Sequence, residues 1–190
     1  MLFFQVFLIA LGLSADAFAV AITNGLSLKD SSRKQALKIA AAFGLFQAVM
    51  PLLGFLLGSV FAEFIGRYAH WVAFIFLGFI GGKMLIDELF AKNKDEKAHE
   101  TLSLRLLLMQ AIATSIDALV VGVSFIAMGI SGLMILPCVA MIGVVTFILS
   151  FLGVDLGKKF GRLLGGRAKI VGGLVLVGIG VKVLVEGLLS

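Results

Sequence analysis

The sequence predicts an all-α polytopic membrane protein, with six transmembrane helices arranged as two inverted three-helix repeats. An apolar composition, a series of long apolar windows and an internal repeat together predict this class. Apolar residues make up 61% of the 190 residues, charged residues make up only 14%, and the mean hydropathy is +1.14. A soluble domain does not need so apolar a chain, whereas a polytopic membrane protein buries its apolar surface in lipid.

Six apolar windows follow one another along the chain. Each is long enough to cross about 30 Å of hydrocarbon as a helix, at about 1.5 Å per residue. The windows lack the strict alternation of transmembrane strands, and a helix satisfies its own backbone hydrogen bonds in lipid. They cover residues 3–23, 37–61, 70–90, 104–127, 132–155 and 169–189.

Single residues in the windows also fit transmembrane helices. The first window has no basic segment before it, so we expect no cleaved signal peptide. We expect Pro51 to kink the second window and Pro137 to begin or bend the fifth. His70 and Trp71 open the third window, where aromatic side chains anchor helices at the membrane interface.

Basic residues between the windows predict the topology. The first, third and fifth loops are basic, whereas the second holds only Arg67 and the fourth holds no basic residue. Basic loops stay in the cytoplasm, so both termini are predicted on the extracytoplasmic side. The net charge of +5 is thereby explained without a nucleic-acid partner.

Two motifs, one in each half of the chain, follow the same pattern. The first window contains LSADAFAVAI and the fourth contains TSIDALVVGV, so that Ser14 and Asp16 correspond to Ser115 and Asp117. An intramembrane carboxylate costs about 2.5 to 3.5 kcal/mol on insertion scales and persists mainly where it faces a partner, a cavity or an ion. We therefore expect both aspartates to point inward and to form one shared site.

The repeat extends beyond the motifs and predicts the organisation of the chain. Residues 51–90 align with residues 150–189, with glycines and a lysine at matching positions. Because each unit has an odd number of helices, the second enters the membrane from the opposite side, as in transporters with inverted repeats. The predicted parts are a first repeat over 1–91, a charged cytoplasmic linker over 92–103 and a second repeat over 104–190.

The alignment adds neutral side chains to the two aspartates. Gln47 in the second window falls opposite Thr146 in the fifth, and inverted repeats hold their substrate near the membrane midplane. Every member offers oxygen, which suits a hard divalent cation such as Mn²⁺, Mg²⁺ or Ca²⁺ better than Zn²⁺ or Cu⁺. The predicted metal ligands are Asp16, Asp117, Gln47, Ser14, Ser115 and Thr146.

The neutral side chains also have a structural interpretation, as hydrogen bonds between helices or to a carbonyl one turn earlier. Asn24 and Thr114 are peripheral candidates for the site. Unwound backbone carbonyls around Gly12, Gly25 or Gly122 are expected to complete the shell.

Other charged and small residues are expected to be structural. Asp155 lies beside Lys158 and Lys159, which predicts an ion pair at the interface. Charged residues near the ends of the third and sixth windows are expected to pair or to reach the interface, namely Lys83, Asp87, Lys182 and Glu186. Glycines spaced for close helix packing are Gly54, Gly58, Gly153 and Gly157.

The chain resembles the MntP family of manganese efflux pumps, which are similar to LysE-type transporters. The resemblance rests on LSADAFAVAI, FGLFQAVMPLLG, HWVAFIFLGFIGGKM, AIATSIDALVVGV and KIVGGLVLVGIGVKVL. It implies export of Mn²⁺ across a bacterial plasma membrane, with Mn²⁺ as transported substrate rather than cofactor and Asp16 and Asp117 as the intramembrane aspartates. The chain departs from the family at Gln47, where some members carry a carboxylate.

The sequence favours a transporter over an enzyme, because it has no GxxxxGK[ST], HExxH or GxSxG motif. Without a nucleotide site, export must draw on an ion gradient, and moving Mn²⁺ out against the voltage costs about 4.6 kcal/mol per 100 mV. Proton antiport, with the aspartates binding metal and protons alternately, is the predicted coupling. The alternatives are an exporter of a basic amino acid, a passive cation channel and a structural or assembly protein. Other divalent cations and a homo-oligomer also stay open.

Overall fold

The computed structural model describes residues 2–27, 33–58, 102–164 and 168–189, together with separate positions between residues 71 and 86. Every regular element in these parts is a helix, which confirms the all-α class. The elements are α1 (Leu2–Ser27), α2 (Arg33–Leu57), α4 (Leu104–Ala113), α5 (Ile116–Ala127), the 3₁₀ helix η1 (Gly132–Met134), α6 (Ile135–Leu164) and α7 (Ala168–Leu189).

Four helical segments are long and apolar enough to cross a membrane, which supports the membrane class. They are Leu2–Leu26, Arg33–Leu57, Leu104–Ile126 and Gly132–Gly161. The sixth window forms α7, in which a shorter apolar stretch covers Ile170–Ile179. The third window lies largely outside the described residues, so the count of six helices stays a prediction.

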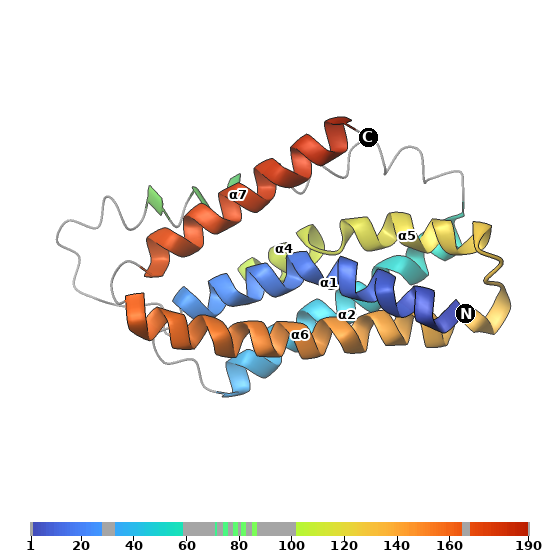
Figure 1. Ribbon diagram of the computed structural model, residues 1–190, viewed down its shortest axis with the longest axis horizontal. Coiled ribbons are helices and arrows are strands. Elements are labelled where there is room, and N and C mark those ends of the chain that lie inside the picture. The colour runs from blue at the N-terminus through green and yellow to red at the C-terminus, as the bar shows by residue number, and fades with distance from the viewer. Residues whose placement is uncertain are drawn as a thin grey trace.

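The helices pack around α1 and α6. These two lie side by side over most of their length and run in the same direction (Figure 1). On the described residues, α6 also contacts α2, α2 contacts α5 and α4, and α7 contacts α1. The central position of α1 and α6 matters for the site, because α1 carries Asp16.

Glycines form the contact between α1 and α6, which we call the glycine seam (Gly25, Gly153, Gly157 and Gly161). A Cβ atom at Gly157 would lie 2.1 Å from the carbonyl oxygen of Ile22. A Cβ atom at Gly153 would lie 2.9 Å from the carbonyl oxygen of Phe18. The two backbones therefore touch only because these residues lack a side chain, and the predicted packing role of Gly153 and Gly157 is confirmed.

The glycines of the second window have two different roles. A Cβ atom at Gly54 would lie 1.9 Å from the carbonyl oxygen of Leu119, so Gly54 packs closely on α5 as predicted. No atom of the described residues lies within 4 Å of the Cβ position of Gly58, so its predicted packing role is not seen in this part of the chain. Gly58 instead ends α2 with a φ of +67°, and its N–H donates to the Gly54 carbonyl oxygen at 3.2 Å. The helix therefore stops at Leu57.

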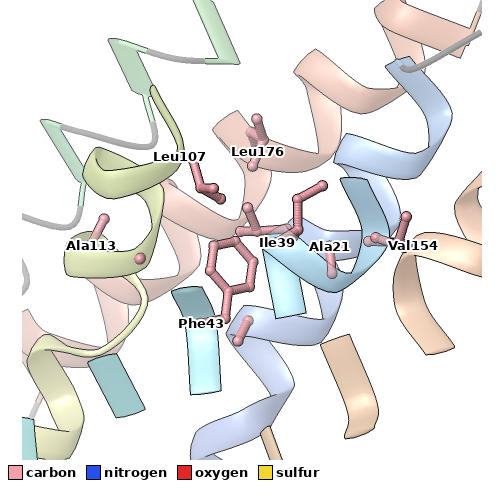
Figure 2. Close-up of a cluster of buried hydrophobic side chains, with 11 residues drawn as sticks. Ala21, Ile39, Phe43, Leu107, Ala113, Val154 and Leu176 are labelled. Carbon is pink, nitrogen blue, oxygen red and sulfur yellow. The ribbon is translucent and has the colours of Figure 1, made fainter. Parts of the chain in front are cut away.

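Two buried apolar clusters form the core. The Phe43 cluster joins the second half of α1 and the first half of α2 to α4, α6 and α7 (Figure 2). The Phe125 cluster joins the first half of α1 to α5 and the first half of α6. The Phe43 cluster consists of Ala17, Val20, Ala21, Ala36, Ile39, Phe43, Leu107, Ala111, Ala113, Val154 and Leu176. The Phe125 cluster consists of Val6, Ala10, Leu13, Ala118, Phe125, Ile130, Ile135, Cys138, Val139 and Ile142.

The fourth window is not one continuous helix, which corrects the prediction for residues 104–127. α4 ends at Ala113, a turn follows, and α5 begins at Ile116. The prolines are accommodated in helices: Pro51 lies inside α2, and Pro137 lies in the first turn of α6, as predicted. The break thus falls at the aspartate motif and not at a proline.

The ion pair predicted for Asp155 is confirmed, with 3.5 Å between its Oδ1 and Lys158 Nζ. Trp71 is helical and 45% exposed, in keeping with a side chain that reaches the interface. Lys182 is exposed on α7. The side chains of His70, Lys83, Asp87 and Glu186 lie outside the described residues.

Candidate metal site

The two predicted aspartates lie near each other in the structure. Asp16 lies in the middle of α1, and Asp117 lies in the first turn of α5. Their carboxylates are close enough to interact electrostatically, although they come from different halves of the chain. Two like charges in an apolar bundle repel unless a cation or protons reside between them. This arrangement is therefore suited to a positively charged ligand.

The break in the fourth window has a local cause. The Thr114 hydroxyl donates to the Gln110 carbonyl oxygen at 2.9 Å, and the Ser115 hydroxyl donates to the Ala111 carbonyl oxygen at 2.7 Å. Two consecutive hydroxyls thus compete for carbonyls one turn earlier. The Ser115 N–H turns instead to the Ile112 carbonyl oxygen at 3.1 Å, a tighter 3₁₀-type bond that ends the helix.

The first window carries the same motif without the break. Ser14 makes the corresponding bond, from its hydroxyl to the Ala10 carbonyl oxygen at 2.5 Å. Leu13 stands where the fourth window has Thr114, so only one hydroxyl competes there, and α1 stays helical from Leu2 to Ser27. The two copies of the motif therefore differ at this position, where the first window has Leu13 and the fourth has Thr114.

The break places Asp117 at the N-terminus of a half-helix. Ser115 is the N-cap residue of α5, and the Ala118 N–H donates to Asp117 Oδ1 at 2.8 Å. A helix N-terminus favours negative charge, because its first N–H groups lack partners within the helix.

Gln47 reaches α1 from α2. Its Nε2 donates to the Leu13 carbonyl oxygen at 2.9 Å, and the side chain is fully buried. Its Oε1 has no hydrogen-bond partner within the described part of the chain. An unpaired buried acceptor is costly. The orientation fixed by Nε2 thus leaves an amide oxygen ready for a cation or a donor.

Ser14 and Thr146 join α1 to α6, with 2.8 Å between their hydroxyl oxygens. Because the Ser14 proton goes to the Ala10 carbonyl, the Thr146 hydroxyl must be the donor in this pair. Both side chains are fully buried. Ser150, one turn further along α6, is also buried, and its hydroxyl has no partner among the described residues. Sequence analysis did not single out Ser150.

The predicted residues occupy one polar layer between the Phe43 and Phe125 clusters. The structure pairs Asp16 with Asp117 and Ser14 with Thr146, and it holds Gln47 against the backbone of α1. In the described residues, no group of three or more His, Cys, Asp and Glu side chains could hold a metal ion. A metal here would therefore depend on two carboxylates and neutral oxygens.

Two peripheral predictions need correction. Gly12 and Gly25 lie within the continuous α1 and Gly122 lies within α5, so none of them marks unwound backbone. The unwinding occurs at the Thr114–Ser115 turn because of the competing hydroxyls. Asn24 is not free to bind metal, since its side chain forms two hydrogen bonds with Gln110.

The comparisons with known proteins agree on one family. A family model described as "Putative manganese efflux pump" matches residues 30–184. A protein named "Putative manganese efflux pump MntP" from Ruminiclostridium cellulolyticum is 47% identical over 182 residues, which cover 96% of this chain and 95% of that protein. A protein of the same name from Methanosarcina barkeri is 48% identical over 189 residues, which cover 100% and 99%. No solved structure matches the chain.

Proposed function

Because the chain belongs to the MntP family of manganese efflux pumps, we propose that it exports Mn²⁺ from the cytoplasm through a midplane site built on Asp16 and Asp117. One observation carries this assignment: carboxylates from the two halves of the chain lie near enough to interact electrostatically within the polar layer of the bundle. The names of the relatives support Mn²⁺ as the transported metal, and the two nearby carboxylates support this part of the bundle as its binding site.

The proposed ligand set matches a hard divalent cation. Two carboxylates neutralise its charge, and Gln47 Oε1 adds a buried oxygen that has no partner among the described residues. The hydroxyl oxygens of Ser14, Ser115 and Thr146 keep lone pairs after their own protons are used. Carboxylate, amide and hydroxyl oxygens suit Mn²⁺ and other hard divalent cations.

The close glycine contacts support an inverted repeat of residues 1–91 and 104–190. Gly44 and Gly143 occupy equivalent positions in the repeat, and a Cβ at either one would lie within 2.9 Å of the other's carbonyl oxygen. Contacts between equivalent residues are expected on a pseudo-two-fold axis. The contact between Gly54 and Leu119 likewise has its equivalent in the contact between Gly153 and Phe18. Residues 92–103 are then the linker between the repeats.

Proton antiport is the proposed source of energy. Export of a divalent cation from an inside-negative cell works against about 4.6 kcal/mol per 100 mV. In the proposed cycle, Mn²⁺ displaces protons from the two aspartates on the cytoplasmic side, and protons from outside expel the metal. Purified protein in liposomes should therefore move protons inward whenever it moves Mn²⁺ outward. Transport of Mn²⁺ without proton flux would refute this coupling.

The function is tested by the Mn²⁺ content of metal-loaded cells that express the wild type or a variant. We expect the wild type to lower cellular Mn²⁺, and Asp16→Asn or Asp117→Asn to reduce export by about tenfold or more while the protein still reaches the membrane. Asp155→Asn is the matched control, because it removes a carboxylate that contacts Lys158 at the end of α6. Unchanged Mn²⁺ with the wild type would sink the assignment, and lysine and arginine efflux would be measured next.

The proposed localisation is a bacterial plasma membrane, with both termini on the extracytoplasmic side. The basic first and fifth loops support this orientation. Proteolysis of a terminal epitope tag in intact cells tests it, since a cytoplasmic tag would be protected.

A further inference from the structure

A second polar contact joins α1 to the fourth window, away from the aspartates. Asn24 Nδ2 donates to Gln110 Oε1 at 2.8 Å, and Gln110 Nε2 donates to Asn24 Oδ1 at 3.1 Å. The two side chains are only 3% and 1% exposed. Each amide thus satisfies both a donor and an acceptor on the other helix.

The amide pair and the aspartate pair both link α1 to the fourth window. Asp16, Val20 and Asn24 are spaced four residues apart, so they share one face of α1. At one end of this face Asp16 interacts with Asp117, and at the other end Asn24 bonds to Gln110. At about 1.5 Å per residue, the amide pair lies about 12 Å from the aspartates, toward the side predicted to be cytoplasmic.

Buried apolar residues lie between the two pairs along the helices. Val20 is fully buried and Ala113 is 5% exposed, and both belong to the Phe43 cluster. Beside Asn24, a Cβ at Gly25 would lie 2.3 Å from the carbonyl oxygen of Val154, so α6 leaves no space there. Separation of α1 from α4 at the amide pair would expose these apolar residues on the way to the aspartates.

The equivalent contact in the other half of the repeat is apolar. The repeat places Phe125 opposite Asn24 and Ile9 opposite Gln110. Phe125 is a buried member of the Phe125 cluster, and Ile9 packs against that cluster. Packing at this point of the repeat therefore does not require amides, and the polar pair is specific to one side of the membrane.

We propose that Asn24 and Gln110 form the cytoplasmic gate of the export pathway, which parts to admit a divalent cation to Asp16 and Asp117. The proposal rests on the proposed function, since it concerns access to the same site. Amides suit this role because each can exchange its partner for water or for a hydrated cation when the helices separate. The turn at Thr114–Ser115 allows α4 to move without α5.

A reversible cross-link tests the gate. Cysteines replace Asn24 and Gln110 in a Cys138→Ala background, which has no other thiol, and a short bis-thiosulfonate bridges them in inside-out vesicles. We expect bridging to reduce Mn²⁺ transport by about tenfold or more and reduction of the bridge to restore it. Each single cysteine variant, treated alike, should transport as much Mn²⁺ after treatment as before it. Unchanged transport in the bridged protein would show that the amide pair only holds α1 and α4 together, and it would overturn the proposal.

Accessibility of α1 gives a second measurement that leaves the amide pair intact. Val20→Cys, in the same background, should react with a membrane-impermeant maleimide from the cytoplasmic side during Mn²⁺ transport. Val6→Cys is the matched control, because Val6 is equally buried on α1 but belongs to the Phe125 cluster, and it should stay unlabelled. Transport without labelling at position 20 would overturn the gate. Absence of any Mn²⁺ transport by the wild type would instead refute the proposed function.

Discussion

A methyl group at Gly157 should force α1 and α6 apart. The Cβ of Gly157→Ala would lie 2.1 Å from the Ile22 carbonyl oxygen and 2.9 Å from Gly25 Cα. Both neighbours are backbone atoms, so α1 must shift by about 1 Å, and overpacking of this kind costs about 1 to 3 kcal/mol. Because the neighbours cannot rotate away, we expect the upper end, about 3 kcal/mol. Alanine's better helix propensity offsets about 1 kcal/mol of this.

The net loss of about 2 kcal/mol corresponds to a fall in Tm of about 4 to 8 °C for a chain of this length. Thermal unfolding of the detergent-solubilised protein, followed by circular dichroism, measures it. Gly178→Ala is the matched control, because no atom in the described part of the chain lies within 4 Å of its Cβ position on α7. That variant should gain about 2 to 4 °C through helix propensity alone. Equal shifts for the two variants would show that the glycine seam is not a close backbone contact.

Further substitutions address the polar layer and the surface. Gln47→Leu removes both the bond to the Leu13 carbonyl and the amide oxygen Oε1, so it should lower Mn²⁺ export by about tenfold or more. Gln47→Glu keeps an oxygen at this position and should retain transport, so an equal loss in both variants would contradict a ligand role. Thr114→Ala combined with Ser115→Ala removes the competing hydroxyls, so α4 should continue into α5 and amide hydrogen exchange at Ile116–Ala118 should become slower. Unchanged exchange would show that the break between the two helices has another cause. Lys158→Ala breaks a partly exposed ion pair, so it should change the free energy of unfolding, measured by chemical denaturation, by less than about 1 kcal/mol. A larger change would show that the ion pair is coupled to the glycine seam.

The sequence was sufficient to predict which helices carry the polar layer. Asp16 and Asp117 stand out because charged residues are rare in apolar windows, and their shared motif indicates that they come from equivalent places. Their electrostatic contact agrees with that expectation.

The features that were not predicted depend on competition between hydrogen bonds within a helix or on residues that differ between the two repeats. Hydropathy predicts one span over residues 104–127, because it is blind to the Ser115 hydroxyl, which takes the Ala111 carbonyl while the Ser115 N–H bonds to Ile112 instead. Gln110 was not predicted as a functional residue, because the prediction relied on polar residues at matching positions of the two repeats and the equivalent of Gln110 is Ile9. The only signal for it was an amide inside an apolar window.

In the proposed transport cycle, the two apolar clusters on either side of the polar layer also act as electrical insulators. When one of them opens, water carries the potential of that compartment up to the aspartates, and the whole voltage falls across the cluster that stays closed. A charge at the polar layer then experiences nearly the full membrane potential, about 2.3 kcal/mol per 100 mV, rather than the half that its depth suggests. The thickness of the closed cluster therefore sets the electric field that acts on the bound ion.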